Sequence, residues 1–216
     1  MSVNNAIPLV YIVDDEFAIR DSLTMLIEST SQLVRSYESA EDFLNDYDPD
    51  QPGCLILDVR MPLMSGLDLQ TELSNRGIII PIIFISGNAE IPDTAKAFRA
   101  GAVDFLKKPF DSELLLERIE EAIKIDIEFR EDLVKRRRIK DRINHLTKRE
   151  KEVLGLIVKS CSNKETAKIL NISNRTVDVH RASIMDKMQA ENIAELITMV
   201  MYFEQPSNSS LEERFH

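Results

Sequence analysis

Short apolar runs recur through the first half of the chain, and each ends at a polar or turn-forming residue. Between these runs, apolar residues recur every three or four positions, which is the period of an amphipathic helix. The pattern predicts strands at residues 8–13, 33–37, 54–57, 78–85 and 102–106. It predicts helices around 19–27, 39–47, 65–75 and 91–100, and a further one from Ser112. Strands that alternate with helices in this way indicate an α/β fold with a five-stranded, doubly wound parallel sheet.

The segment from Ser112 to about Ile143 contains neither Pro nor Gly, and its apolar residues recur at roughly helical spacing. One long helix could therefore connect the two halves of the chain. Two alternatives stay open, a partly frayed and solvated linker or a dimerising coiled coil. The coiled coil is less favoured because Asp126 and Arg136 interrupt the apolar seam.

The second half is all-α, with four short helices. Two sequences of the capping-box type, Thr147–Glu150 and Ser162–Glu165, open the first two helices. A tight turn at Asn171–Ser173 precedes the third helix, and a fourth is expected over 191–203. Two short helices joined by a three-residue turn are typical of a helix-turn-helix. The residues from Pro206 onward are expected to form a disordered tail.

Charge divides the chain in the same place as the helix pattern. Residues 1–124 hold 10 Lys and Arg against 22 Asp and Glu, whereas residues 133–190 hold 15 against 6. The net charge of −10 therefore hides a basic second half, which favours two domains with different partners. Neither a secretory signal nor a membrane span is evident, and nothing in the sequence indicates a disulfide between Cys54 and Cys161. We expect a reduced, cytoplasmic protein.

Polar side chains with complementary chemistry stand at the ends of four predicted strands. They are Asp14 and Asp15 after the first strand, Asp58 after the third, Ser86 after the fourth and Lys108 after the fifth. The carboxyl ends of parallel strands meet at one edge of the sheet, where ligands bind. Clustered carboxylates favour a hard cation such as Mg²⁺, and a lysine and a hydroxyl suit a phosphoryl group. A carboxylate can itself attack phosphorus.

Residues 8–124 resemble the receiver domain of two-component response regulators. The matching segments are Val13–Glu16, Asp58–Gly66, Ser86–Gly87 and Asp104–Phe110. The resemblance implies that Asp58 accepts a phosphoryl group from the phosphohistidine of a sensor kinase. It also implies that Asp15, Asp58 and the backbone carbonyl of Arg60 ligate Mg²⁺ (or Mn²⁺), with Asp14 acting through water.

The same resemblance implies how the switch works. Lys108, rather than Lys107, matches the family lysine because it directly precedes Pro109. Ser86, where the family more often has Thr, would bond the phosphoryl oxygen, and Phe105 would turn into the space left behind. Residues 88–90 depart from the pattern of near relatives. We hypothesise that Asn88 and Arg60 tune dephosphorylation by gating the attacking water.

Residues 146–203 closely resemble the LuxR-type DNA-binding domain, through Leu146–Leu154, Asn163–Ala167, Arg175–Arg181 and Ile184–Met188. The resemblance and the helical phase turn Asp178, Val179 and Ala182 towards the major groove. Candidate phosphate contacts are Lys164, Arg175, Arg181 and Lys187, for which a solvated surface charge is the alternative. Thr176, within the matching segment, is a further candidate DNA contact, and Val177, Ile184 and Met188 are expected in the core.

Together these resemblances imply a response regulator of the FixJ/NarL class. Its domains would be a receiver over 6–124, a helical linker over 125–143, a LuxR-type domain over 144–205 and the tail over 206–216. Phosphorylation would switch dimerisation and binding to a double-stranded DNA operator. The implied partners are a sensor histidine kinase, RNA polymerase and a second copy of the chain, with no membrane involved. Beyond its own phosphorylation and slow dephosphorylation, the chain would not be an enzyme.

Three other interpretations stay open. A haloacid-dehalogenase-like phosphohydrolase also uses a strand-end Asp, but it carries a second Asp where this chain has Arg60. A quorum-type ligand sensor shares the DNA-binding half but would lack the arrangement of acids and Lys108. The third interpretation is a phosphate sink or constitutive regulator that keeps the site without using it as a switch.

Overall fold

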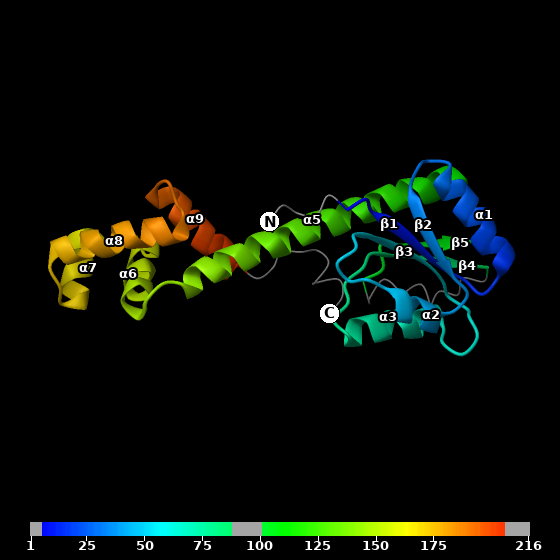
Figure 1. Ribbon diagram of the computed structural model, residues 1–216, viewed down its shortest axis with the longest axis horizontal. Coiled ribbons are helices and arrows are strands. Elements are labelled where there is room, and N and C mark those ends of the chain that lie inside the picture. Colours follow the sequence, from blue (N-terminus) through cyan, green and yellow to red (C-terminus); the bar gives the residue numbers. More distant parts are fainter. Residues whose placement is uncertain (1–5, 88–100, 206–216) are drawn as a thin grey trace. The chain divides into compact units, whose positions relative to one another are not determined.

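The structure is a computed structural model, and it describes residues 6–87 and 101–205. Its first half contains a sheet of five parallel strands in the order β2-β1-β3-β4-β5 (Figure 1). The strands are β1 (Leu9–Val13), β2 (Leu33–Tyr37), β3 (Gly53–Asp58), β4 (Ile82–Ser86) and β5 (Asp104–Lys107). Because the strand order reverses between β1 and β3, the carboxyl ends of these two strands border the crevice where such sheets bind ligands.

Helices cover both faces of this sheet (Figure 1). Alternate residues of each strand point to opposite faces. Val10, Ile12 and Ile56 therefore join one apolar cluster with α1 (Phe17–Glu28) and the first part of α5 (Ser112–Asn144). Tyr11, Leu55 and Leu57 join the other, with α2 (Ala40–Asp46) and α3 (Gly66–Asn75). The predicted doubly wound α/β architecture is confirmed.

Several predicted boundaries need correction. The fourth strand begins at Ile82 rather than at residue 78, because Pro81 has no N–H with which to join the ladder. The fifth strand runs from Asp104 to Lys107, so it is shifted from the predicted 102–106. In the second half, Asn192 caps the last helix, which begins at Ile193 rather than at residue 191. The predicted helix at 91–100 and the tail at 206–216 lie outside the described residues.

Helix caps follow the sequence signals closely. Ser65 and Asp68 form a capping box at the start of α3, as do the two predicted pairs in the second half. At α2 the Ser39 side chain accepts from the Asp42 N–H. The Asp42 carboxylate accepts from the Ser39 hydroxyl at 2.6 Å, so only the first half of a capping box is formed at this helix.

Helix α5 runs unbroken for 33 residues, as predicted for a long helix between the two halves. Asp126, which interrupts the apolar seam, is buried, because its carboxylate forms hydrogen bonds within the receiver half. Its Oδ2 accepts from Gly53 N at 2.8 Å and from Arg130 Nε at 2.7 Å. The Arg130 guanidinium also donates to the carbonyls of Pro49 and Gln51, at 2.7 and 3.0 Å. This anchor holds the middle of α5 against the amino end of β3.

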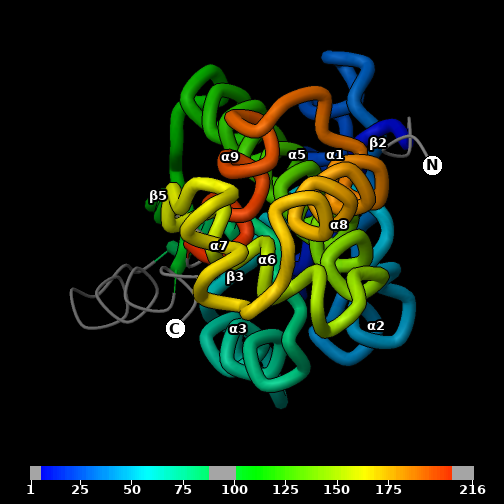
Figure 2. The backbone as a smooth tube through the Cα atoms, turned by 90° about the vertical axis from the view of Figure 1, so that its left-hand side faces the viewer, coloured from blue at the N-terminus to red at the C-terminus, as the bar shows by residue number. Residues whose placement is uncertain are grey.

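The chain divides into two compact units between Glu131 and Asp132, within α5. The end of α5 therefore belongs with the second unit, where Ile139 is buried in the core. This core is completed by four further helices (Figure 2), namely α6 (Lys148–Val158), α7 (Asn163–Leu170), α8 (Asn174–Met188) and α9 (Ile193–Glu204). Val177, Ile184 and Met188 are fully buried in α8, as predicted. The turn between α7 and α8 passes through Asn171 in the left-handed conformation.

Candidate functional site

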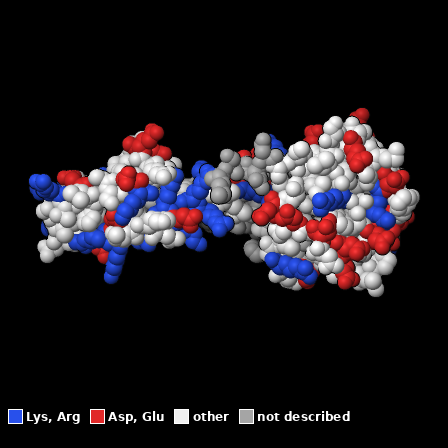
Figure 3. All heavy atoms as spheres, in the orientation of Figure 1, with Lys and Arg blue, Asp and Glu red and all other residues white. Residues whose placement is uncertain are grey.

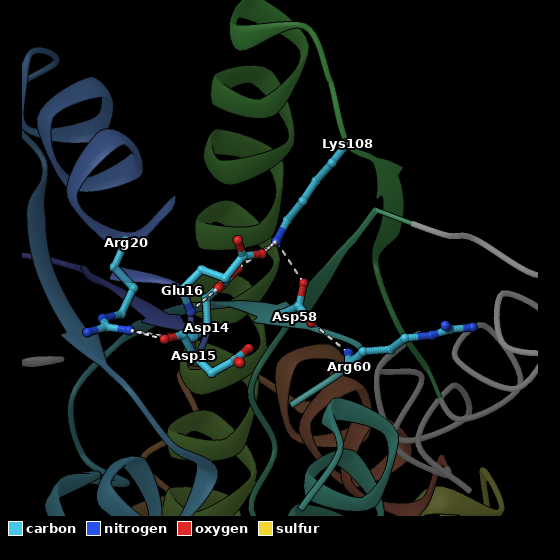
Figure 4. A network of polar contacts seen from close by, with 7 residues as sticks. All are labelled: Asp14, Asp15, Glu16, Arg20, Asp58, Arg60 and Lys108. Atoms are coloured by element: carbon cyan, nitrogen blue, oxygen red, sulfur yellow. Dashed lines mark hydrogen bonds and ion pairs between the residues drawn. The ribbon is translucent and has the colours of Figure 1, made fainter. Parts of the chain in front are cut away.

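Two aspartates from neighbouring strands share one lysine at the carboxyl edge of the sheet (Figure 4). Asp14 follows β1, Asp58 ends β3, and Lys108 follows β5. The Lys108 ammonium lies 2.7 Å from Asp14 Oδ2 and 2.8 Å from Asp58 Oδ1. Asp14 is fully buried and Asp58 is 6% exposed. The structure thus brings together three of the predicted site residues through contacts that join distant parts of the chain.

Backbone groups hold the two carboxylates in place. Asp58 Oδ2 accepts from the Arg60 N–H at 2.6 Å, and Asp14 Oδ1 accepts from the Glu16 N–H at 2.9 Å. The loop after Asp58 returns closely to the strand, since a Cβ on Gly66 would lie 2.2 Å from the Asp58 carbonyl oxygen. Only glycine fits at this position without moving the backbone around the site.

The electrostatics of the site are unbalanced, because two carboxylates face one ammonium. Burial raises the pKa of Asp58, and the hydrogen bond from Lys108 only partly offsets this effect. Burial alone would lower the pKa of Lys108, but its hydrogen bonds to Asp14 and Asp58 outweigh that effect and raise it. Ionised Asp58 is therefore held in an environment that disfavours its charge, as is common for reactive groups.

The other predicted residues of this site lie around the pair. Ser86 is 1% exposed at the end of β4, and its carbonyl accepts from the Lys108 N–H at 2.8 Å. Phe105 is half-buried and stacks on Phe84 with ring centroids 6.0 Å apart. Arg60 is exposed beside the site, and Asn88 lies outside the described residues.

Carboxylate ligands for a hard cation are present at this edge of the sheet, but only two of the three predicted aspartates converge on one point. Asp14 and Asp58 converge on the Lys108 ammonium, whereas the Asp15 side chain is exposed (Figure 4). Within residues 6–87 and 101–205, no group of three or more His, Cys, Asp or Glu is placed to hold a metal ion. The Lys108 ammonium thus supplies the positive charge between Asp14 and Asp58. Carboxylate oxygens suit Mg²⁺, and the Asp15 side chain would have to turn towards the other two to complete a set of three.

Two residues near the site were missed from sequence. Glu16 Oε1 lies 3.9 Å from the Lys108 ammonium, and Arg20 donates to the carbonyls of Asp14 and Asp15 at 2.7 and 3.0 Å (Figure 4). The available signal was spacing, because Arg20 follows Asp14 and Asp15 by six and five positions. It positions the backbone that carries the two aspartates.

In the second unit, α8 presents most of the predicted DNA-contacting residues to solvent. Val179 is 62% exposed, which is unusual for a valine and suits an apolar contact to a base. The other exposed residues of the predicted set are Lys164, Arg175, Asp178 and Ala182, and the half-buried ones are Thr176 and Arg181. Their DNA contacts stay a prediction.

Lys187 is engaged differently from the prediction. Its ammonium binds both carboxylate oxygens of Glu150, at 2.9 and 2.7 Å. Ser183 Oγ and the Thr147 N–H also donate to this carboxylate, at 2.6 and 2.7 Å. Glu150 is 4% exposed, so Lys187 is committed to a buried acid that joins α6 to α8. The structure therefore favours a structural role for Lys187 over a phosphate contact.

The charge asymmetry predicted from sequence is visible on the surface. Acidic side chains gather over the face of the first unit shown in Figure 3, and lysines and arginines are prominent on the second. Basic surface suits a polyanion such as DNA. In the part of the chain that the structure describes, no helix is long and apolar enough to cross a membrane.

Comparison with known proteins agrees with both halves. Residues 10–120 match the response regulator receiver domain family, and residues 144–200 match the bacterial regulatory proteins of the luxR family. The chain is 46% identical over 189 residues to response regulator protein TodT of Pseudomonas putida, covering 88% of this chain and 83% of TodT. It is 40% identical over 193 residues to transcriptional regulatory protein FixJ of Rhizobium meliloti, covering 89% and 94%.

Solved structures give the same result. Response regulator StyR superposes with a TM-score of 0.83 at 39% identity, over 91% of this chain and 99% of StyR. The fold and the strand-end site define a receiver coupled to a helix-turn-helix. The chain belongs to the response regulators of the FixJ/NarL class, which are DNA-binding transcriptional regulators of two-component systems. Receiver domains generally bind Mg²⁺ for phosphorylation.

Proposed function

We propose that Asp58 is the phosphoryl acceptor of this regulator. Its Oδ1 faces the Lys108 ammonium at 2.8 Å at the open edge of the sheet, and this observation carries the proposal. A carboxylate oxygen of Asp58 attacks phosphorus, the phosphorus–nitrogen bond of a kinase phosphohistidine breaks, and an acyl phosphate forms. The imidazole leaves and takes up a proton. Asp14 is the less suited acceptor because it is fully buried.

A divalent cation would be held by Asp15, Asp58 and the Arg60 carbonyl, with Asp14 behind them. When bound, Mg²⁺ supplies the positive charge that three carboxylates and an incoming phosphoryl group require. Lys108 then moves its ammonium from the carboxylate of Asp58 to a phosphoryl oxygen. Self-catalysed phosphorylation and slow dephosphorylation are the only reactions we propose for this chain.

Ser86 and Phe105 would change position in response to the phosphoryl group. The Ser86 hydroxyl bonds a phosphoryl oxygen and draws its loop inward. Phe105, which is half-buried and stacked on Phe84, would turn into the vacated space. Arg60, which is exposed beside the acceptor, and Asn88 would tune the access of the hydrolytic water.

The output would be dimerisation and operator binding. Phosphorylated dimers place two copies of α8 on half-sites about one helical turn apart. Asp178, Val179 and Ala182 read base edges, and Lys164, Arg175 and Arg181 contact phosphates, with Thr176 beside them. We assign residues 6–124 to the receiver and 144–205 to the DNA-binding domain. Contact with RNA polymerase follows from control of transcription.

The test is intact mass and size after incubation with acetyl phosphate and Mg²⁺. The wild type is expected to gain one phosphoryl mass and to shift to a dimer, and Asp58→Asn to do neither. Asp46→Asn, which changes an exposed aspartate of the same domain, serves as the matched control and keeps both responses. Phosphoryl gain in Asp58→Asn would contradict the acceptor assignment, and gain without dimerisation in the wild type would contradict the output.

A further inference from the structure

The second unit contains a contact between the two helices of its helix-turn-helix that bears on base recognition. The Asn163 side-chain amide, at the start of α7, donates to Asp178 Oδ1 on α8. Asn163 is the first residue of α7, and the capping box of Ser162 and Glu165 closes the first turn of that helix. In that box, the Ser162 N–H donates to the Glu165 carboxylate at 2.8 Å. The amide therefore reaches Asp178 from the capped first turn of α7.

The partner of Asp178 is notable because charged donors stand closer in sequence. Arg175 and Arg181 each lie three residues away on the same helix, yet within residues 101–205 neither forms an ion pair with Asp178. A neutral amide orients the carboxylate without neutralising it. The two arginines stay available for phosphates, and the carboxylate keeps its negative charge when it accepts a hydrogen bond from a base.

Asp178 is exposed beside Val179, which is 62% exposed on the same helix. A carboxylate directed at a base edge accepts from the amino group of cytosine, and the keto oxygens of guanine and thymine repel it. An exposed aspartate that is free to rotate loses part of this selectivity, because ordering a mobile side chain on binding costs free energy. A donor that fixes the rotamer in advance removes that cost.

We propose that Asn163 is a positioning residue for sequence recognition, and that it presents the Asp178 carboxylate to a cytosine of the operator half-site. This inference rests on the proposed role of Asp178 in base reading and adds a residue of α7 to it. Asn163 acts through Asp178, so its removal weakens the preference for cytosine at one position and does not weaken binding to all sequences alike.

The experiment is selection of binding sites from a pool of randomised DNA duplexes by the full-length protein treated with acetyl phosphate and Mg²⁺. It compares the wild type with Asn163→Ala, Asp178→Ala and the double variant. The wild type is expected to prefer cytosine at one half-site position by about tenfold. Asn163→Ala lowers this preference by roughly three- to fivefold, Asp178→Ala removes it, and the double variant matches Asp178→Ala. Lys164→Ala, next to Asn163, is the matched control and weakens all sequences alike.

Three results would overturn the proposal, and they are distinguishable. If Asp178→Ala kept the cytosine preference, the base-reading role of Asp178 would fail, and this inference with it. If Asp178→Ala lost the preference and Asn163→Ala kept it, only the positioning role would fail. If Asn163→Ala still changed base preference in the Asp178→Ala background, Asn163 would contact DNA directly. Thermal denaturation of each variant separates loss of folding from loss of preference.

Discussion

Each half of this regulator pairs a lysine with a buried carboxylate, but the pKa of the carboxylate is raised in one half and lowered in the other. In the receiver, Lys108 is divided between Asp14 and Asp58, and the pKa of Asp58 is raised because burial outweighs the help of one shared ammonium. In the DNA-binding half, Lys187 serves Glu150 alone, with Ser183 and the Thr147 N–H as further donors. There the hydrogen bond from Lys187, with the others, lowers the pKa of Glu150 to about 2.

The difference separates a reactive site from a structural one. Donors surround the Glu150 carboxylate, so its charge is stabilised by folding. The receiver acids carry more negative charge than the fold neutralises, which leaves a place for a cation and a phosphoryl group. The anchor at the other end of β3 is an intermediate case. There Asp126 is paired with Arg130, but its Oδ1 is buried without a partner among the described residues.

The largest expected effect is at this anchor. Arg130→Ala leaves the Asp126 carboxylate buried and without its ion pair, and it frees the carbonyls of Pro49 and Gln51. We expect the receiver to lose about 3 kcal/mol of unfolding free energy, measured by hydrogen exchange of the β3 amides. Arg76→Ala, which removes an exposed pair with Glu72, is the control and should change little. Equal effects of the two variants would contradict a structural anchor.

Next in size is Glu150→Ala in the DNA-binding half. It removes the acceptor for Lys187, Ser183 and the Thr147 N–H together, so we expect a loss of roughly 2–3 kcal/mol. Hydrogen exchange in α6 and α8 measures it. Glu165→Ala removes the equivalent capping-box residue from an exposed position and is expected to have a smaller effect. If both changes cost the same, the Lys187 contact would add nothing to the cap.

The pH dependence of this half follows from the same carboxylate. The folded pKa of Glu150 is about 2, against an ordinary value of 4.5. The unfolded chain therefore binds its proton more readily, so the stabilisation is complete above the ordinary value and is lost as pH falls towards 2. Acid titration of stability by circular dichroism should show a loss on the order of 2 kcal/mol, and Glu150→Gln should flatten that slope. An unchanged slope in Glu150→Gln would contradict this assignment.

The smallest expected effect on stability is at the phosphoryl acceptor. The raised pKa of Asp58 means that its ionised form is less favourable in the folded protein than in the unfolded chain. Asp58→Asn removes this penalty together with the ion pair to Lys108, so stability should rise by less than about 1 kcal/mol. The melting temperature of the receiver transition, without added metal, measures the change. A clear loss of stability would mean that Asp58 is a structural acid like Glu150.

Much of this molecule was predictable because its signals are local. Apolar periodicity predicted the order of strands and helices, and Thr147 and Ser162 marked helix starts through capping. The strand-end acids and Lys108 were identified because parallel strands bring their carboxyl ends to one edge. The errors have local causes too, such as Pro81, which shortens β4.

The sequence by itself determined the two halves, the faces of their helices and the residue types at the strand ends, since period and composition fix these over a few residues. Only the tertiary structure decided how charge is divided, because the partners lie far apart in the chain. Lys108 meets Asp14 across 94 positions, Asp126 meets Gly53 across 73, and Lys187 meets Glu150 across 37. From the sequence, Asp126 was interpreted as an interruption of the apolar seam and Lys187 as a candidate phosphate contact. Folding buried Asp126 against the Gly53 N–H and paired Lys187 with Glu150, because a buried charge is tolerated only where a partner is brought to it.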